Sequence, residues 1–333
     1  MILAAGLGQR MRPLTLVRAK PVLPVLNRPL LHWTLERLVA HGFTDVIVNL
    51  HHLPESVTAA LGDGSELGLR VRYSREKKIL GTAGGPRAVR GLFGAEPFLL
   101  VNGDVLFDFD LRALVESHRR TGARATLALR RNPDPREYGK VVTDRRGRIL
   151  SLAGRPGRAR GTVSLFTGVH VVDPALLDRL APGPSGMVSD LYAPLVEEGG
   201  HLQGVRVEGA WYDLGRPRLY LETQLRLLRG SSGARGLVHP DARVARGAQL
   251  RRCVVGAAAV GEGARLERAI LWDGARVEEG ARVTDSIVVA GATVGRGERA
   301  LGVVVVPERA VRGRSDIGGR VERRGSMAWV AIR

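Results

Sequence analysis

The sequence predicts two domains of different architecture, an α/β sheet domain followed by a parallel β-helix. Three observations predict this. Apolar strands alternate with helical periods in the amino-terminal part, which is typical of a mainly parallel sheet. A buried strand over 97–102 runs into the acid Asp104, and such folds bind ligands where strands end. Beyond residue 236 the period changes, and Gly-Ala pairs recur about every seventeen residues, at Gly247, Gly263 and Gly280.

The composition fits a globular protein with two cores, since 44% of the 333 residues are hydrophobic. No run of about eighteen apolar residues is present, and no charged-then-apolar leader precedes the first motif. We therefore expect a soluble, cytoplasmic protein without a membrane partner. The single cysteine, Cys253, fits a reducing compartment.

The net charge of +18 does not by itself indicate a nucleic-acid partner. The basic residues are almost all arginine and are scattered through every segment, instead of forming a stripe. Aromatic residues for base stacking make up only 5% of the chain and do not alternate with the arginines. We expect small anionic substrates and no nucleic acid.

The segment 3–15 is a candidate phosphate-binding loop. Gly6 and Gly8 carry no side chain, so the backbone can approach anionic oxygens with its N–H groups. Arg10, Arg12 and Lys20 follow and could neutralise the remaining charge. The spacing is neither that of a P-loop nor that of a dinucleotide-binding turn. A plain strand-to-loop turn is the alternative.

The rest of the amino-terminal domain is predicted from its apolar periods. Helices are expected over 30–41, 54–61, 110–120 and 189–198. Strands are expected over 45–49, 69–73, 97–102, 125–129, 137–142, 166–172 and 202–207. Gly42 should end the first helix, and Ser189 should cap the last one. His51 and His52 follow a strand, but adjacent side chains point apart, so we interpret them as loop residues and not as metal ligands.

The segment Leu80–Pro86 places glycines directly before a helical run. Free amides at the start of a helix could hold a ribose, a base or a phosphate. A tight turn would need the same glycines, so both interpretations stay open for this segment.

Two carboxylates are candidate metal ligands. Asp104 follows a buried strand, and Asp213 follows the apolar pair Trp211 and Tyr212. A hard cation such as Mg²⁺ takes carboxylate oxygens together with substrate phosphates. Asp104 could instead cap the turn before Leu106, and Asp213 could cap a helix beginning near Pro217. Because both acids end apolar strands, we expect them to share one Mg²⁺ ion.

The segment 3–15, LAAGLGQRMRPLT, followed by KPVLPV over 20–25, resembles the signature of the sugar-1-phosphate nucleotidylyltransferases. Further segments resemble elements of that family in the expected order: 80–84, 101–104, 138–139 and 211–217. The chain departs from the pattern at Gln9, Ala19, Thr167 and Arg216. It also has Gly154-Arg155-Pro156 where the family has Glu-Lys-Pro.

The resemblance implies a Rossmann-like, mixed, mainly parallel sheet with helices on both faces, and a left-handed parallel β-helix. We predict a nucleotidyltransferase domain over 1–229, a linker over 230–236, the β-helix over 237–312 and a carboxyl-terminal tail over 313–333. The implied reaction joins an NTP to a sugar 1-phosphate and releases pyrophosphate. Positioning and charge neutralisation do most of this work.

The resemblance also implies roles for individual residues. Arg10 would bind the leaving phosphates, Lys20 the phosphates near the reacting centre, and Asp104 with Asp213 the Mg²⁺ cofactor. The implied nucleotide-binding residues are Leu3, Ala4, Ala5, Gly6, Gly8, Gly81, Thr82, Ala83 and Gly84. The implied sugar-phosphate residues are Tyr138, Gly139, Arg155, Thr167 and Gly168. Tyr138 as a buried hinge and Arg155 as part of a solvated loop are the alternatives.

Overall similarity favours GTP with mannose 1-phosphate as substrates. Uridylyl or thymidylyl transfer to another hexose 1-phosphate is an alternative, as is a non-catalytic regulatory subunit that binds NDP-sugar. The base, the sugar and the oligomeric state cannot be read from the sequence. We expect the β-helix to form a homo-oligomer and to do no acyl-transfer chemistry, because its only histidine is His239 and Cys253 fits a core position. A chain ending near Arg229 should then keep its transfer activity.

Overall fold

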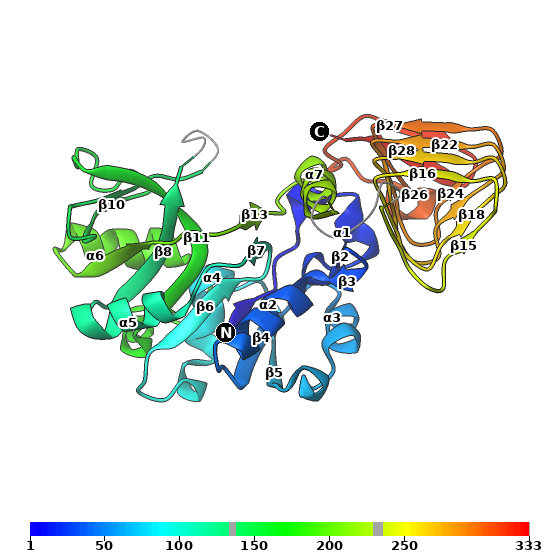
Figure 1. Ribbon diagram of the computed structural model, residues 1–333. Coiled ribbons are helices and arrows are strands. Elements are labelled where there is room, and N and C mark those ends of the chain that lie inside the picture. The colour runs from blue at the N-terminus through cyan, green and yellow to red at the C-terminus, as the bar shows by residue number, and fades with distance from the viewer. Residues whose placement is uncertain (133–137, 229–235, 333) are drawn as a thin grey trace. The chain divides into compact units, whose positions relative to one another are not determined.

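The computed structural model describes residues 1–132, 138–228 and 236–332 (Figure 1). Most of the predicted linker, 230–235, lies outside these described residues, and Gly236 begins the first strand of the β-helix. Within the described residues, none of the helices is both long enough and apolar enough to cross a membrane.

The chain divides into two compact units that do not follow the predicted boundary at residue 229. The first unit comprises Met1–Gly6 and Thr34–Tyr212, and the second comprises Leu7–Trp33 and Asp213–Arg333. The candidate phosphate loop therefore belongs mostly to the same unit as the β-helix. The strand Ile2–Leu3, which leads into the loop, belongs to the first unit.

The first unit is built on a mixed sheet whose main path has the order β10-β9-β11-β6-β1-β4-β5. Strand β8 also pairs with β11, and β12 pairs with β8. The strands are β1 (Ile2–Leu3), β4 (Asp45–Leu50), β5 (Arg70–Arg75), β6 (Phe98–Asn102), β8 (Ala125–Arg131), β9 (Val141–Thr143), β10 (Ile149–Leu152), β11 (Thr162–Val172) and β12 (Leu202–Arg206). Strands β1, β4, β5 and β6 are parallel, and β11 runs antiparallel to β6. The predicted mixed, mainly parallel sheet is confirmed.

The helices of this region follow the predicted periods closely. They are α2 (Leu30–Ala40), α3 (Pro54–Leu61), α4 (Gly81–Ala88), α5 (Arg112–Thr121) and α6 (Ala193–Glu197). Helix α2 is followed by Gly42 at φ +81°, as expected for a glycine stop. Asp110, two residues before α5, accepts a hydrogen bond from the Arg112 amide at 2.8 Å.

The helix predicted over 189–198 begins earlier, at Met187, and with a different geometry. The last helical segment of this unit begins as a π-helix, η6 (Met187–Tyr192), and continues into α6. Ser189 lies inside η6 and does not cap it. Asp190 makes the local bond instead, accepting from the Gly186 amide at 2.7 Å. Serine and aspartate both suit caps, so the sequence alone does not distinguish them.

The main core of the first unit lies between the sheet and the helical segment 187–197. Leu100 of β6, Leu127 of β8 and Val172 of β11 are fully buried there, together with Tyr192 and Leu195 of the helical segment. Burial of these side chains fixes the segment against the sheet, because apolar burial contributes about 25 cal/mol per Å².

The second unit carries the β-helix, three parallel sheets in which each coil stacks on the one before (Figure 1). The first sheet contains β14 (Gly236–Val238), β17 (Cys253–Val255), β20 (Ile270–Leu271), β23 (Ile287–Val288) and β26 (Val303–Pro307). The second contains β15 (Arg243–Val244), β18 (Ala259–Val260), β21 (Arg276–Val277) and β24 (Thr293–Val294). The third contains β16 (Gln249–Arg251), β19 (Arg265–Glu267), β22 (Arg282–Thr284) and β25 (Arg299–Leu301).

The register of these sheets confirms the predicted repeat. Val254 pairs with Ile270, Ile270 with Ile287, and Ile287 with Val304, so equivalent aliphatic residues of successive coils lie above one another. Cys253 is fully buried, and burial raises the pKa of its thiol, as expected for a core cysteine.

The segment 313–333, predicted as a tail, contains two strands, β27 (Val321–Arg324) and β28 (Met327–Ala331). Strand β28 runs antiparallel to β26, with Val330 opposite Val304 and Trp329 opposite Val305. The last coil contains the apolar strand β26. The chain itself pairs with the edge of that coil.

The remaining elements include the helices α1 and α7, 3-10 turns and small strands. In the second unit, η1 (Gln9–Met11), α1 (Leu14–Val17) and η2 (Lys20–Val22) precede the hairpin β2 (Pro24–Val25) and β3 (Arg28–Pro29), and α7 (Pro217–Leu227) precedes the β-helix. Strands β7 (Val105–Phe107) and β13 (Trp211–Asp213) form a separate two-stranded sheet.

Candidate active site

Strands β1 and β6 end side by side at the carboxyl edge of the sheet, and Asp104 follows directly. Leu3 pairs with Asn102, and the Gly103 amide donates to the Leu3 carbonyl at 2.9 Å. A Cβ on Gly103 would lie 2.6 Å from the same carbonyl oxygen, so this approach requires glycine. The partly exposed Asp104 therefore stands where the predicted nucleotide-binding backbone of residues 3–6 leaves the sheet.

A buried polar chain connects this edge to the glycine-rich helix α4. Asn49 Oδ1 accepts from the Ala4 amide at 2.7 Å, and Asn49 Nδ2 donates to Glu76 Oε1 at 2.7 Å. Glu76 Oε2 accepts from the Leu80 amide at 2.9 Å. Both side chains are buried, so each bond matters for the position of the groups that it joins. Neither Asn49 nor Glu76 has a role that could be predicted from the sequence.

Two amides in the first turn of α4 are already bonded to the protein, although the sequence predicts free amides there. The amides of Ala83 and Gly84 donate to the Ser185 carbonyl at 2.9 and 3.3 Å. A Cβ on Gly81 would lie 2.5 Å from that carbonyl oxygen, and one on Gly84 would lie 2.4 Å from the Gly183 oxygen. These glycines therefore admit the backbone of 183–185. Their contact with a nucleoside stays a prediction.

Four of the five predicted sugar-phosphate residues lie in two adjoining groups. The rings of Tyr138 and Trp211 meet edge to face with centroids 5.7 Å apart, and Trp211 Nε1 donates to the Thr167 carbonyl at 2.9 Å. A Cβ on Gly168, at φ +81°, would lie 2.6 Å from Asn102 Nδ2. This arrangement connects the Tyr138 ring to the end of β6, two residues before Asp104.

Thr167 and Gly139 are held by bonds that the sequence does not reveal. Thr167 is buried, and its hydroxyl donates to the Ala128 carbonyl at 2.9 Å. Asn132 Nδ2 donates to the carbonyls of Tyr138 and Gly139 at 3.2 and 3.4 Å. Asn132 is thus a positioning residue for the predicted Tyr-Gly pair.

Arg155 is paired with Glu197 of α6. Its Nε and Nη2 donate to the two carboxylate oxygens at 3.1 and 2.7 Å, and Nη1 donates to the Ser189 carbonyl at 3.4 Å. The arginine side chain is 51% exposed and the glutamate 36%. An ion pair this exposed contributes about 0–1 kcal/mol. A phosphate group could exchange with Glu197 at small cost, so the clamp role of Arg155 stays a prediction.

In the second unit, Gly8 shapes the phosphate loop. It lies at φ +58°, and its carbonyl accepts from the Met11 amide and the Thr15 hydroxyl, both at 2.9 Å. A Cβ on Gly8 would lie 2.7 Å from Thr15 Cγ2 and 3.4 Å from the Cβ of Lys20. The glycine thus lets the loop close onto Lys20, which is buried.

Arg10 and Asp213 are brought together in the same unit. A Cβ on Gly215 would lie 3.1 Å from both Asp213 carboxylate oxygens and 3.4 Å from Arg10 Nη1. The predicted phosphate-binding cation and one predicted metal ligand are therefore neighbours. Asp104 belongs to the first unit, so its sharing of a metal ion with Asp213 stays a prediction.

Arg12 does not have the role expected from the sequence. Its side chain is buried, and Nη1 forms an ion pair with Asp316 of the segment after the β-helix. A buried guanidinium needs a carboxylate partner, and a residue three hundred positions away supplies it. Arg12 thus fastens the loop, while Arg10 and Lys20 stay the candidate phosphate ligands.

Residues of the β-helix contact the segment that follows the phosphate loop, directly and through Tyr220 of α7. Trp272 is fully buried, donates from Nε1 to the Tyr220 hydroxyl at 3.0 Å, and has Arg18 5.4 Å from its ring centroid. The Tyr220 hydroxyl in turn donates to the Pro24 carbonyl. Asn27 Nδ2 donates to the Val255 carbonyl at 2.9 Å. These contacts join residues that lie between 52 and 228 positions apart or, for Arg18 and Trp272, farther still, with no local signal in the sequence.

A buried hydroxyl–imidazole pair lies close to the predicted sugar-phosphate residue Gly168 of β11. The Tyr192 hydroxyl lies 2.7 Å from His170 Nδ1, and both side chains are buried. Burial, with a smaller contribution from the Met1 ammonium, lowers the pKa of His170 to about 3. A neutral imidazole can pair with the tyrosine hydroxyl through Nδ1 without a charge on either group, and burial raises the pKa of Tyr192.

We expect the free energy of unfolding to fall as the pH drops below 6.5, because the unfolded chain binds a proton at His170 that the folded chain does not. Stability from this group is complete above that pH and is lost progressively toward the folded pKa of about 3. Urea unfolding between about pH 7 and 5 measures the slope before most carboxylates titrate. A His170→Gln variant with the same slope would contradict this origin.

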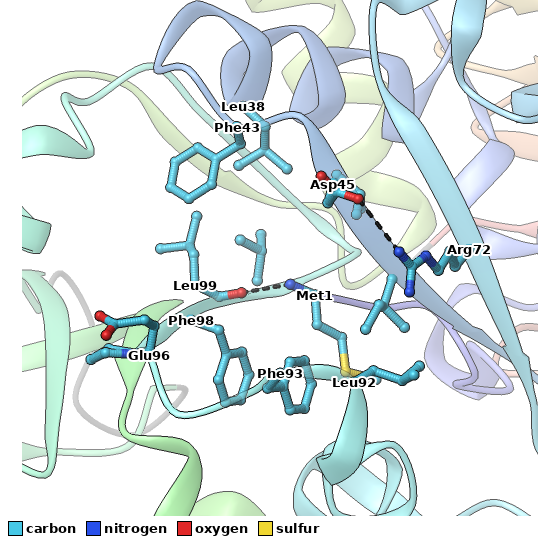
Figure 2. Close-up of a pocket in the computed structure, with 14 residues that line it drawn as sticks. Met1, Leu38, Phe43, Asp45, Arg72, Leu92, Phe93, Glu96, Phe98 and Leu99 are labelled. Carbon is cyan, nitrogen blue, oxygen red and sulfur yellow. Dashed lines mark hydrogen bonds and ion pairs between the residues drawn. The ribbon is translucent and has the colours of Figure 1, made fainter.

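A cavity of about 310 Å³ lies at the other edge of the sheet (Figure 2). Met1, Asp45 and Phe98, at or near the starts of β1, β4 and β6, contribute to its lining, and Arg72 forms an ion pair with Asp45. The Met1 amino group donates to the Leu99 carbonyl at 2.6 Å. Asp104 follows the carboxyl end of β6, so this cavity is separate from the predicted substrate edge.

Throughout 1–132, 138–228 and 236–332, no three histidine, cysteine, aspartate or glutamate side chains gather as a metal-binding group. A partly exposed carboxylate at a strand end fits Mg²⁺, which keeps several waters and takes phosphate oxygens. The carboxylates of Asp104 and Asp213 are each chemically suited to such an ion, and their sharing of one ion stays a prediction.

Comparisons with known proteins agree with both parts of the chain. Residues 1–230 match the nucleotidyl transferase family, and residues 241–325 match the GlmU-like C-terminal hexapeptide family, as predicted for the left-handed β-helix. A mannose-1-phosphate guanylyltransferase of Mycobacterium tuberculosis is 35% identical over 288 residues, which are 83% of this chain and 80% of that protein.

Two further relatives cover less of the chain. A UTP–glucose-1-phosphate uridylyltransferase of Synechocystis is 34% identical over 231 residues, 65% of this chain and 60% of that protein. The crystal structure of HddC from Yersinia pseudotuberculosis shares the fold with a TM-score of 0.58 at 20% identity, covering 68% of this chain and 97% of that one. Since the family match covers well over half of the residues, the chain belongs to the nucleotidyl transferase family.

Proposed function

We propose that the protein transfers a nucleotidyl group from an NTP to a sugar 1-phosphate, with GTP and mannose 1-phosphate as its substrates. An oxygen of the sugar phosphate attacks the α-phosphorus, and the bond to the leaving pyrophosphate breaks. The observation that carries the proposal is the 35% identity, over 83% of the chain, to a mannose-1-phosphate guanylyltransferase. The ordered motifs support the same reaction.

The chain's own residues supply charge and position. In the proposal, Arg10 binds the leaving phosphates, and Lys20 binds the phosphates near the reacting centre. Residues 3–6 and 81–84 contact the nucleoside, and the Tyr138 ring with residues 167–168 faces the sugar. Asp104 and Asp213 would hold Mg²⁺, which neutralises the charge that develops on the phosphates.

The experiment is pyrophosphate release from the full-length protein across a panel of NTPs and sugar 1-phosphates. We expect the highest kcat/KM for GTP with mannose 1-phosphate. A maximum for UTP or dTTP with glucose 1-phosphate would replace the proposed substrates and keep the reaction. Release with no pair, together with measurable NDP-sugar binding, would show a regulatory subunit instead.

Arg155→Ala should raise the KM for the sugar phosphate several-fold and leave the KM for the NTP nearly unchanged. The guanidinium can exchange Glu197 for a phosphate at small cost. Arg179→Ala is the matched control, because Arg179 pairs with the neighbouring Glu198 and is similarly exposed. Equal effects of Arg155→Ala on both substrates would mean that Arg155 is not a phosphate ligand.

We also propose that the β-helix assembles the protein into a homo-oligomer. The edge of β26 is paired with β28, so assembly would use the faces of the three sheets and not this edge. Light scattering of the full-length protein measures the mass, and a monomer at micromolar concentration would overturn the proposal.

A further inference from the structure

The segment 183–197 contacts two regions that the proposed function assigns to the substrates. They are residues 80–84 at the start of α4, here called the nucleoside side, and residues 166–170 of β11, here called the sugar side. The segment runs from Gly183 through η6 into α6. Helix η6 is a π-helix, a rare conformation that is common at functional sites. Pro194 follows it and lacks the N–H that a continuous α-helix would use. No role was predicted for this segment beyond a helix.

The first end of the segment fixes the nucleoside side. The Ser185 carbonyl accepts from the Ala83 and Gly84 amides, and the Ser185 amide donates to the Leu80 carbonyl at 2.8 Å. The Met187 amide donates to the Thr82 hydroxyl at 2.8 Å. The first turn of α4 is therefore bonded to the segment and not only to itself.

The other end fixes the sugar side. The Tyr192 hydroxyl binds His170, which lies in β11 two residues after Gly168. The pairing of β11 with β8 is irregular between Phe166 and His170, the stretch that carries the predicted sugar residues. His170 is the first residue at which regular pairing resumes, opposite Leu127. A bond at this position anchors the irregular stretch at one end.

A third contact reaches the candidate phosphate cation. Glu197 and the Ser189 carbonyl both accept hydrogen bonds from Arg155. The segment thus touches α4, β11 and Arg155. Its interior side chains Met187, Leu191 and Leu195 are buried in the core, and a close-packed interior transmits a displacement at one end of the segment to the other.

We propose that the segment 183–197 sets the separation between the nucleoside side and the sugar side of the site, with Tyr192 as its positioning residue. The roles of the two sides rest on the proposed function, but the hydrogen-bonded connection between α4 and β11 through the segment does not. Tyr192 touches no substrate in this proposal and acts through His170 and the helix. Loss of its hydroxyl leaves a buried ring nitrogen without a partner and loosens both ends.

Tyr192→Phe tests this, with Thr126→Val as the matched control. Thr126 Oγ1 and His118 Nδ1, 3.0 Å apart, form another buried hydroxyl–imidazole pair of the same unit, between β8 and α5. In Tyr192→Phe we expect hydrogen exchange of the Ala83 and Gly84 amides to accelerate about tenfold. We expect no such change at these amides in Thr126→Val.

Kinetics form a second readout on the same variants. Tyr192→Phe should raise the KM for NTP and for sugar phosphate together, by several-fold each, whereas Thr126→Val should change neither. If Tyr192→Phe does not fold, Thr82→Val tests the other end of the segment, because it removes the hydroxyl that accepts from the Met187 amide. Thr82→Ser keeps this hydroxyl and should behave like the wild type. In that case faster exchange at 166–170 in Thr82→Val supports the proposal.

The outcomes separate the two proposals. Unchanged exchange at Ala83 and Gly84 in a folded Tyr192→Phe protein, or the same change in Thr126→Val, overturns the positioning role. If Tyr192→Phe is not folded, unchanged exchange at 166–170 in Thr82→Val does the same. If the wild-type protein turns over no substrate pair and Tyr192→Phe still accelerates exchange at Ala83 and Gly84, the proposed function is contradicted and the connection is supported.

Discussion

Asp104→Asn should lower turnover by a factor on the order of 10²–10³ while the protein stays folded. The amide has no charge with which to hold Mg²⁺ against a triphosphate, and Asp213 alone would have to replace it. Asp104 is partly exposed, so the substitution leaves no cavity in the core. The measurement is pyrophosphate release at saturating and limiting Mg²⁺, with circular dichroism as the check on folding.

Asp173→Asn is the matched control for this substitution. Asp173 also follows a buried strand of the same sheet, but β11 runs antiparallel to β6, so Asp173 lies at the opposite edge. It accepts a hydrogen bond from the Ala175 amide at 2.9 Å and should affect only stability. Activity of Asp104→Asn within tenfold of the wild type would refute the metal assignment.

Trp272→Ala should destabilise the second unit by about 3–5 kcal/mol and raise the KM for NTP. The indole is fully buried and supports Tyr220 and Arg18, which hold the residues that follow the phosphate loop. Thermal unfolding measures the first effect, and initial rates at varied NTP measure the second.

Trp329→Ala separates the two effects. Trp329 is also buried in the second unit, but it lies in β28 opposite Val305. We expect a comparable loss of stability with an unchanged KM for NTP. Similar KM values in both variants would show that the β-helix does not position the loop.

These contacts change the expectation for a chain ending near Arg229. From the sequence alone, such a chain is expected to keep its transfer activity, because the β-helix reads as a separate assembly module. Removal of the residues beyond Arg229 would take Trp272 away from Tyr220 and would leave the Arg12 guanidinium without its partner Asp316. An unpaired buried guanidinium is costly, so the truncated chain should lose most of its activity.

Local periodicity predicted the elements because it is a property of neighbouring residues. The helix over 54–61 and the strand ending at Asn102 have the expected bounds, since apolar spacing and a proline or glycine at the ends determine them. The stacking of the coils was also predictable, because an aliphatic residue returns at the same place in each coil.

The supporting contacts of the site were not predictable in the same way. Asn49 and Glu76 are joined across parallel strands, and Arg12 finds Asp316 across most of the chain. Nothing near these residues in the sequence specifies the partner. The glycines of α4 illustrate a related difficulty, because the same lack of a side chain suits a nucleotide or the backbone at Ser185.

The strand β28 that covers the last coil has a consequence for aggregation. A stack of coils with a bare end presents a row of unpaired backbone groups, onto which another molecule could add its own strand and begin a fibril. Here the outermost strand is β27, whose sequence Val-Glu-Arg-Arg places three charges in a row, and Arg324 pairs with Glu322 at 2.8 Å. A strand with so many charges is a poor template, so this end of the stack resists growth by strand addition.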